Sequence, residues 1–304
     1  MPSEVRPVVV GVDGSDATIA ALRTASAEAR RRGAPLQLVH VVPDSFPMLA
    51  LDPSTSEVLA TDGARLLAEA TATAAAQAPD LEIEAVLRRG GIAAELAAES
   101  AYADVLFLGR DPDVLSEQAR RANAGAGVAA RAGCPVVVVP ADWDPERSRG
   151  PVVVGLKSPA HSLELLGDGF ATAEAQGRRL VVLHAWSLPG VYDDIIVARV
   201  SPTGPGDRAS EAVERLLRDW KVEFPRVEVE VDIVHARPVR ALLEASRTSG
   251  SVGVVRRPHG RVAALGGTIR ALLRRAACPV RVVAPRTGLA TPGPVLERAR
   301  SLTR

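Results

Sequence analysis

The sequence predicts an α/β fold made of two tandem, doubly wound domains, each with a five-stranded parallel sheet. One observation is a repeat: short strings of residues recur in the second half of the chain at a constant spacing. The other is that five short apolar runs alternate with longer helical patterns in each half, which is typical of parallel strands covered by helices on both faces. The spacing is much longer than the ~20–50 residues of a solenoid repeat, so it indicates a duplicated domain. The matched positions include Gly11 and Gly155, His40 and His184, and Cys134 and Cys278.

The apolar runs define the expected strands. In the first half they cover residues 7–12, 36–41, 81–87, 104–108 and 135–139, with helices over 15–32, 56–76, 92–101 and 116–132. In the second half they cover residues 151–156, 180–184, 227–234, 252–255 and 279–283. The valine run 136–139 would leave a bare apolar edge, which is an aggregation hazard. We therefore expect the two halves to pack through this run and its counterpart, residues 280–283.

The boundaries follow from composition. Residues 140–150 are polar, contain Pro and Gly, and lack an apolar period, which is typical of a linker. We expect a first domain over residues 1–142, a linker over 143–150, a second domain over 151–286 and a tail over 287–304. The tail is rich in Pro, Gly and Arg and is expected to be loose, with a short terminal helix.

Composition excludes several classes of function. The 304 residues suit two domains of ~150 residues each, and 47% hydrophobic with 24% charged residues is ordinary for a globular protein. A net charge of +1 and 3% aromatic residues do not favour nucleic-acid binding. No apolar stretch approaches ~18 residues, and the N-terminus runs straight into a strand. We expect a cytoplasmic protein that binds neither nucleic acid nor membranes.

Two other groups of residues have simple structural interpretations. Cys134 and Cys278 each precede a proline and an apolar run, so we expect buried small hydrophobes rather than redox groups. The arginines at positions 30–32 fall at the end of an expected helix, where cations complement the helix dipole. We expect them to form a solvated cap rather than a nucleic-acid patch.

The end of the first strand reads Gly-Val-Asp-Gly-Ser, with the carboxylate at Asp13. In doubly wound sheets ligands bind beyond the carboxyl ends of the strands, where a carboxylate can accept from a ribose hydroxyl or an adenine amine. Gly14 allows a tight turn, and Ser15 can cap the next helix. The alternative is that Asp13 and Ser15 only end the strand and cap the helix.

These strings, together with Val-His-Val at the second strand and Cys-Pro-Val-Val-Val-Val near the end of the first half, resemble the universal stress protein family. The resemblance covers nearly the whole chain apart from the linker and tail. It implies the adenine nucleotide alpha hydrolase-like fold and dimer-like association. In the nucleotide-binding branch it implies ATP held by the first-strand Asp, the end of the second strand and a Gly-x2-Gly-x9-Gly-Ser/Thr loop. The matching positions here are Asp13, Val41, Gly109, Arg110 and Asn123, with ATP and Mg in the first half only.

The loop after the fourth strand departs from that pattern. Pro112 stands at the second glycine, and Ala122 and Asn123 stand at the third glycine and the hydroxyl residue. A phosphate cradle depends on backbone N–H groups, whereas proline has none and fixes φ. Pro258 is the counterpart in the second half. Arg110 and Arg256 precede these prolines and could contact phosphate through their side chains, although Asp111 would oppose it.

The second half departs further, because Lys157 replaces Asp13. An ammonium only donates hydrogen bonds and cannot replace an accepting carboxylate. Lys157 could instead bind an anion or be a solvated surface residue, while Gly266 and Gly267 fill the later glycine position. His40 and His184 end the second strand of each half without a visible catalytic partner, so we expect structural histidines.

These observations favour a non-catalytic stress-response regulatory or interaction protein with an unidentified protein partner. Its nucleotide site is expected to be degraded in the first half and lost in the second. The alternative is an ATP-binding switch with one site in the first half. No paired carboxylates, Ser/His/Asp set or metal cluster stands out, so we expect no activity beyond a weak ATPase. The halves could form an intramolecular pseudo-dimer or pair again as a homodimer.

Overall fold

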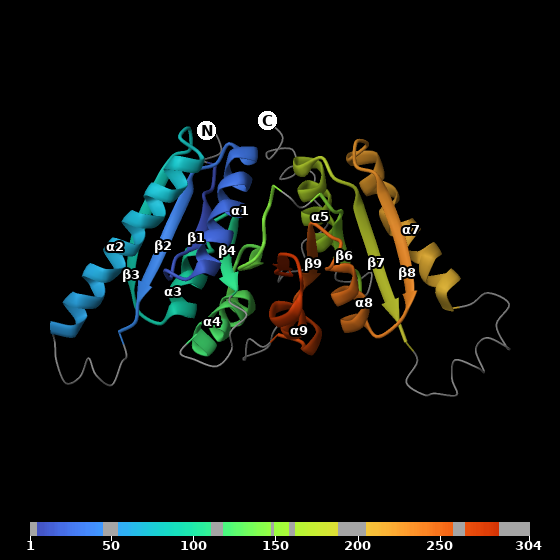
Figure 1. Ribbon diagram of the computed structural model, residues 1–304. Coiled ribbons are helices and arrows are strands. Elements are labelled where there is room, and N and C mark those ends of the chain that lie inside the picture. Colours follow the sequence, from blue (N-terminus) through green and yellow to red (C-terminus); the bar gives the residue numbers. More distant parts are fainter. Residues whose placement is uncertain are drawn as a thin grey trace.

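A computed structural model describes residues 5–44, 54–110, 118–146, 149–157, 162–187, 205–257 and 265–285. The first half alternates strands and helices in the expected order (Figure 1). The expected third strand begins two residues later than predicted, and the fourth helix begins at Gln118. The elements are β1 (Val8–Gly11), α1 (Asp16–Arg32), β2 (Leu36–Val42), α2 (Ser54–Gln77), β3 (Ile83–Arg89), α3 (Ile92–Glu99), β4 (Val105–Arg110), α4 (Gln118–Arg131) and β5 (Val136–Pro140).

The second half repeats this order. Its elements are β6 (Val152–Gly155), α5 (Leu163–Gln176), β7 (Leu180–Trp186), α7 (Pro205–Glu223), β8 (Val229–His235), α8 (Pro238–Ala245), β9 (Ser251–Val255), α9 (Gly267–Arg275) and β10 (Val280–Val283). The expected tail, residues 287–304, lies outside the described residues, as do residues 158–161 and 258–264.

All the described strands belong to one ten-stranded sheet in the order β3-β2-β1-β4-β5-β10-β9-β6-β7-β8. Within each half every strand pair is parallel, which confirms two doubly wound five-stranded units. The halves lie side by side in Figure 1, with their strands inclined in opposite senses. This arrangement is that of two copies related by an approximate two-fold axis.

The halves join through β5 and β10, as the valine run 136–139 predicts. These strands pair antiparallel, with Val280 opposite Val138, Arg281 opposite Val137 and Val282 opposite Val136. Val137 and Arg281 occupy the same place in the two repeats, so the approximate two-fold axis passes between them. The pairing satisfies both edge strands within one chain.

Side-chain contacts confirm the register of the repeat around α3 and α8. The Ser100 hydroxyl accepts a hydrogen bond from the Gly133 N–H at 2.8 Å, and the Ser246 hydroxyl accepts one from the Ala277 N–H at 3.1 Å. Ser100 and Ser246 are therefore equivalent, as are Gly133 and Ala277, so the second half gains two residues before its third helix and loses them again after it.

The two faces of the sheet are packed differently. On the face covered by α3, α4, α8 and α9, one hydrophobic core runs through both halves and includes Val136 and Val138 beside Val280 and Val282. On the opposite face there are two separate cores, one under α1 and α2 and one under α5 and α7. Arg281 lies between those two cores.

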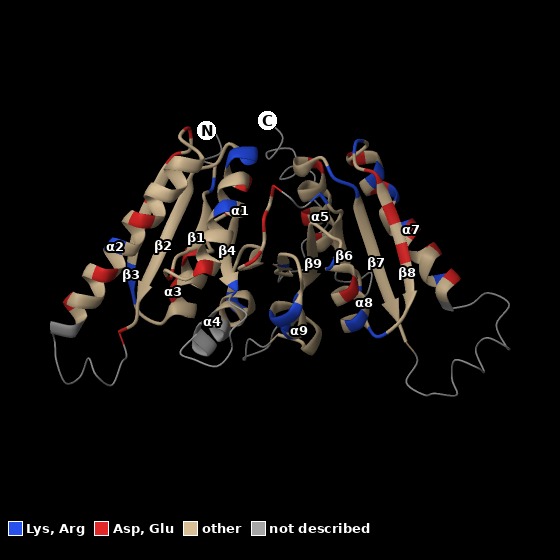
Figure 2. Cartoon of the chain, viewed as in Figure 1, with Lys and Arg blue, Asp and Glu red and all other residues tan. Residues whose placement is uncertain are grey.

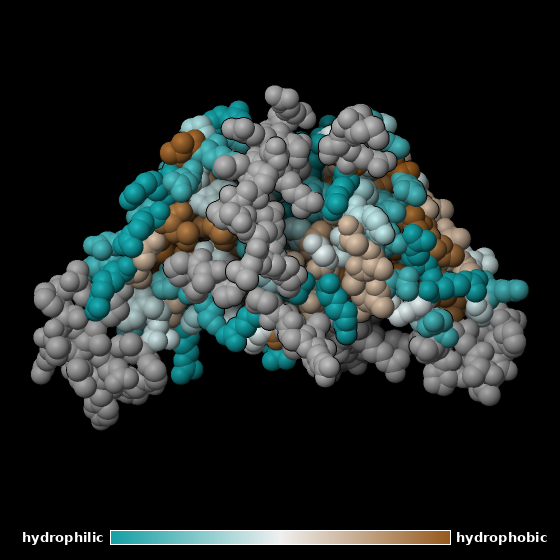
Figure 3. Space-filling model, turned by 180° about the vertical axis from the view of Figure 1, so that it is seen from behind, coloured by the Kyte–Doolittle hydropathy of each residue, from teal (hydrophilic) through white to brown (hydrophobic). Residues whose placement is uncertain are grey.

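The surface agrees with the composition. In the reverse view, hydrophilic side chains cover much of the described surface, with small hydrophobic patches between them (Figure 3). The large hydrophobic side chains that are exposed, such as Tyr102 and Val222, are separate from one another in the sequence. Among the described helices, none has the length and apolar character needed to cross a bilayer.

Candidate functional site

The fold brings the expected nucleotide residues of the first half to one edge of the sheet. β1 lies between β2 and β4, so the chain leaves β1 on one side and returns on the other. Such a switch point in strand order opens a crevice beyond the carboxyl ends of the strands. Asp13, Val41 and Gly109 lie at the carboxyl ends of these three neighbouring strands.

The Asp13 carboxylate is bonded to its own loop. Its Oδ1 atom accepts hydrogen bonds from the Ser15 N–H at 3.0 Å, the Ser15 hydroxyl at 2.6 Å and the Thr18 hydroxyl at 2.7 Å. The Thr18 oxygen in turn accepts from the Asp13 N–H at 3.3 Å. Asp13 therefore fixes the passage from β1 to α1.

The two residues after Asp13 behave differently from each other. Gly14 has φ of +77°, so the tight turn expected there requires the left-handed conformation that glycine adopts readily. Ser15 occupies the N-cap position of α1, but its side chain makes no capping hydrogen bond to the helix. The capping role predicted for the Ser15 hydroxyl is wrong, because that hydroxyl donates to Asp13 instead.

Gly109 has a packing reason to be glycine. A Cβ atom there would lie 2.5 Å from the carbonyl oxygen of Ala17 and 2.8 Å from its Cβ. The first turn of α1 therefore packs directly on the backbone of β4. Val255 is the counterpart of Gly109, and in the second half α5 begins at Leu163, with Ser162 as its N-cap residue.

Val41 is buried in the core that the two halves share. The preceding residue, His40, donates from Nδ1 to the Val12 carbonyl oxygen at 2.7 Å, and His184 makes the same bond to Leu156 at 2.9 Å. Because a carbonyl only accepts, Nδ1 carries the proton in both rings. Both histidines tie the end of the second strand to the loop after the first, in agreement with the structural role expected for them.

Arg110 reaches across to the other half. Its guanidinium donates to the Ala276 carbonyl at 2.5 Å and, at 3.5 Å, to that of Leu273, both at the C-terminal end of α9. Arg256, its counterpart, donates to the Ala132 carbonyl at 3.0 Å, just beyond the end of α4. Each arginine thus complements the negative end of the other half's last helix.

Burial lowers the pKa of both guanidiniums, although Asp142 and Cys278 act in the opposite direction on Arg110. Arginine stays charged despite such a shift. The sequence analysis did not predict these two contacts. The arginine that both halves carry at this position could have indicated a shared structural role.

The backbone around Asn123 differs between the halves. α4 begins at Gln118, so Asn123 lies in the second turn of the helix. Its counterpart Gly267 is the first residue of α9, with Gly266 as the N-cap. In a helix only the first four N–H groups lack a partner within the helix. Asp111, Pro112 and Pro258 lie outside the described residues.

The second half lacks an acceptor at the equivalent place after its first strand. Lys157 follows β6 and is exposed. The ammonium can attract an anion but cannot accept a hydrogen bond from adenine or ribose.

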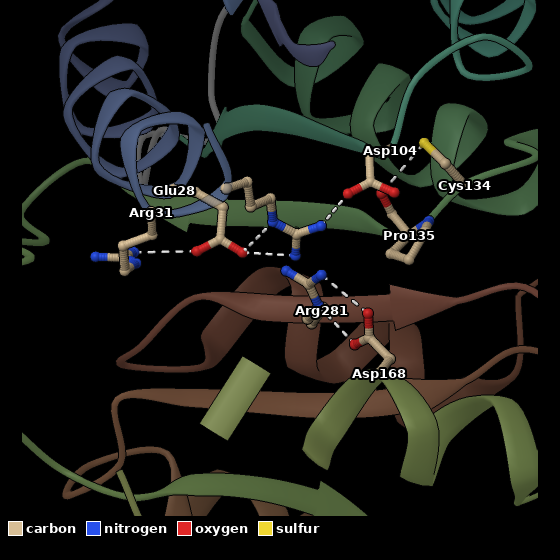
Figure 4. Close-up of polar contacts among 8 residues, drawn as sticks. Glu28, Arg31, Asp104, Cys134, Pro135, Asp168 and Arg281 are labelled. Atoms are coloured by element: carbon tan, nitrogen blue, oxygen red, sulfur yellow. Dashed lines mark hydrogen bonds and ion pairs between the residues drawn. The ribbon is translucent and has the colours of Figure 1, made fainter. Parts of the chain in front are cut away.

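A buried ion cluster fills the space between the two separate cores (Figure 4). Arg281 on β10 donates to both oxygens of Asp168 on α5, at 2.5 and 2.9 Å. On the side of the first half, Glu28 bonds Arg31 and Arg32, and Arg32 also reaches Asp104. The ion pairs thus form within each half, and the two sets meet at the junction, where Arg281 acts on the charge of Glu28.

Within this cluster Glu28 is the most deeply enclosed carboxylate, with a side chain 2% exposed. Burial raises the pKa of Glu28, but the guanidiniums of Arg32, Arg281 and Arg31 overcome it and lower the pKa to about 2. Burial likewise lowers the pKa of Arg281, while Asp168 and Glu28 raise it by more. Glu28 and Arg281 are therefore both charged at neutral pH.

The structure corrects one prediction here. The arginines at positions 30–32 do end α1, as expected, but Arg32 is not a solvated cap: its side chain is only 10% exposed. It lies between Glu28 and Asp104 and is paired with both.

The cysteines are buried, as the sequence indicates. Burial raises the pKa of both thiols to about 12, so they stay protonated at neutral pH. Across the described ranges no group of three His, Cys, Asp or Glu side chains is arranged to hold a metal ion.

Comparison with known proteins agrees with the fold and the repeat. The sequence profile of the Universal stress protein family matches residues 4–140 and again residues 149–284. A universal stress protein of Mycolicibacterium smegmatis is 27% identical over 295 residues, covering 92% of this chain and 97% of its own. One of Mycobacterium tuberculosis is 28% identical over 303 residues, covering 92% and 98%.

Solved structures show the same architecture. A universal stress protein from Archaeoglobus fulgidus superposes with a TM-score of 0.67 at 16% identity, covering 91% of this chain and 98% of its own. A functionally unknown protein from Pseudomonas aeruginosa gives 0.57 at 11% identity, covering 98% and 96%. With two matches of the family profile on two doubly wound units, this chain belongs to the universal stress protein family, in its tandem two-domain form.

Proposed function

We propose that this chain is a non-catalytic regulatory or interaction protein of the universal stress type, with a nucleotide site that is degraded in the first half and lost in the second. The proposal rests on the polar groups at the switch point, which form hydrogen bonds to other parts of the protein. Asp13 holds the β1–α1 loop, and Arg110 holds the end of α9. A ligand in this crevice would have to compete with those bonds for the Asp13 Oδ1 atom and for the Arg110 guanidinium.

The phosphate side of the crevice supports the same proposal. A helix N-terminus attracts phosphate through its unpaired N–H groups. Asn123 lies beyond the first four residues of α4, so its N–H group falls within the helical hydrogen-bond pattern. Pro112, which precedes this helix in the sequence, has no backbone N–H group to offer a phosphate.

In the second half Lys157 replaces the accepting carboxylate. Val255 also places a side chain where the first half has Gly109. These two changes support loss of the nucleotide site there.

A second candidate function is an ATP-binding switch in the first half. It is favoured by the meeting of Asp13, Val41 and Gly109 at the switch point. In that case Asp13 and the backbone at Val41 would hold the nucleoside, Asn123 would face the Mg-bound phosphates, and Arg110 would have to leave Ala276 to reach them.

Calorimetric titration of the full chain with Mg-ATP separates the two candidates, after a check for adenine nucleotide that co-purifies. The matched control for Asp13→Ala is Asp16→Ala, which removes an exposed carboxylate at the first residue of α1. We expect no binding that depends on Asp13 up to millimolar ATP. One-site micromolar binding that Asp13→Ala abolishes and Asp16→Ala preserves would establish the switch instead. Turnover of ATP by the purified chain would contradict the non-catalytic proposal.

A further inference from the structure

A concave surface of about 810 Å³ lies on the second half and begins where Ser187 follows β7 and Arg237 precedes α8. We name it the α8–α9 groove, since α8 lines most of it and the end of α9 completes it. Figure 2 shows basic segments on both helices. Its charged lining residues are Arg237, Arg240, Glu244, Arg247 and Arg275.

Within the described parts of the chain, most of this positive charge has no neutralising partner. Arg247 pairs with Glu244 at 3.0 Å. For Arg237, Arg240 and Arg275, no carboxylate of the described residues lies within ion-pair distance, and all three are exposed. Four guanidiniums and one carboxylate leave the groove with a charge of about +3. A concave wall concentrates the field of such charges at its centre.

The first half has no equivalent of this groove's charge. Around α3 the counterparts of Arg237, Arg240 and Arg247 are glycine or alanine, and only Arg275 has a basic counterpart, Arg131. Over the matched segments, residues 91–101 carry two glutamates, whereas residues 237–247 carry three arginines and one glutamate. The scaffold does not require arginines here, because α3 packs in the same way without them.

Arginine is suited to anions with several phosphate oxygens, since its planar fork donates two parallel hydrogen bonds to one phosphate. We propose that the α8–α9 groove binds a chain of phosphate groups, such as the oligophosphate of a nucleotide or free inorganic polyphosphate. Arg237 and Arg240 would hold one end of the anion and Arg275 the other, with Arg247 fixed by Glu244 at the rim.

This site is separate from the crevice at Asp13, and the two respond to different variants. If the first half binds ATP, Asp13→Ala weakens that binding and leaves the groove unchanged. If the groove binds ATP through its phosphates, replacement of its arginines weakens binding and Asp13→Ala does not.

The test is calorimetric titration of the full chain at low salt with tripolyphosphate, ATP and inorganic phosphate. The variant is Arg240→Gln with Arg275→Gln, which removes charge from both sides of the groove. Its control is Arg215→Gln with Arg218→Gln on α7, where lysine, arginine and glutamate side chains are mixed. We expect one site for tripolyphosphate, weakened roughly tenfold or more by the groove variant and unaffected by the control.

Equal affinities for ATP and tripolyphosphate would identify the phosphate chain alone as the ligand, and tighter binding of ATP would identify a nucleotide. Raising the salt concentration should weaken binding in both cases. The proposal is overturned if tripolyphosphate does not bind, or if it binds as tightly to the groove variant as to the unaltered chain while thermal melting shows both to be folded.

Discussion

At the carboxyl end of its first strand the first half has Asp13, and the second half has Lys157 at the same place. Around the third helix of each half, the second half carries the charged side chains. It has arginines where the first half has glycine and alanine. The hydrophobic repeat, the histidine bonds and the reciprocal Arg110 and Arg256 contacts remain alike in both halves. Packing has thus kept the two-fold relation, while the charged surface residues have diverged.

The ion cluster at the junction is the clearest break in that relation. It occurs once, on the axis, because Val137 and Thr24 stand in the first half where the second has Arg281 and Asp168. In an interface between two second halves, Arg281 would face another Arg281. The cluster therefore favours pairing of the two unlike halves within one chain.

The largest effect is expected from Arg281→Val, which copies Val137 onto the other half. Asp168 would lose both hydrogen bonds from Arg281 and remain buried, and breaking such a pair costs roughly 3–5 kcal/mol. The loss should appear in the free energy of unfolding from urea titration. Adding Asp168→Thr, which copies Thr24, should recover much of it. A single variant as stable as the unaltered chain would show that the Arg281–Asp168 pair does not stabilise the fold.

A second, smaller effect concerns pH. The pKa of Glu28 in the folded chain is about 2, below its ordinary value of 4.5. Its carboxylate therefore stabilises the fold fully above pH 4.5, and this stabilisation is lost as the pH falls from 4.5 toward 2. The full shift corresponds to roughly 3 kcal/mol. The free energy of unfolding measured across this range should fall less steeply for Glu28→Gln, and equal slopes would argue against the shift.

The third prediction tests where the halves are alike. Arg110→Ala and Arg256→Ala should each cost about 1–3 kcal/mol, because each leaves a helix-end carbonyl at the junction without its donor. Urea titrations of the two variants should give similar losses, while Lys157→Ala, at an exposed position, should change stability by no more than about 0.5 kcal/mol. A loss confined to one arginine would show that the two contacts are not equivalent.

Much of this molecule could be predicted from its sequence. The repeat of Gly11, His40 and Cys134 indicated a five-stranded unit in each half. The valine run before Pro140, which would otherwise be an unpaired edge, indicated the junction through β5 and β10. Such patterns are local or periodic, so the chain order is enough to read them.

The ion cluster could not be predicted in this way. Glu28, Asp104 and Asp168 come from distant parts of the chain, and each would ordinarily be assigned to the surface. The one visible signal was Arg281 within a buried valine strand, since a buried guanidinium needs a carboxylate partner. The same holds for Arg110, whose acceptor lies in the other half.

We propose that the two halves share a scaffold but not a ligand site. Hydrogen exchange measured by mass spectrometry on the full chain, with and without millimolar Mg-ATP, tests it in both halves at once. We expect unchanged exchange in peptides that cover the β1–α1 loop around Asp13 and the equivalent loop around Lys157, with any protection confined to α8 and the end of α9. Protection of the loop around Asp13, lost in Asp13→Ala, would contradict the account.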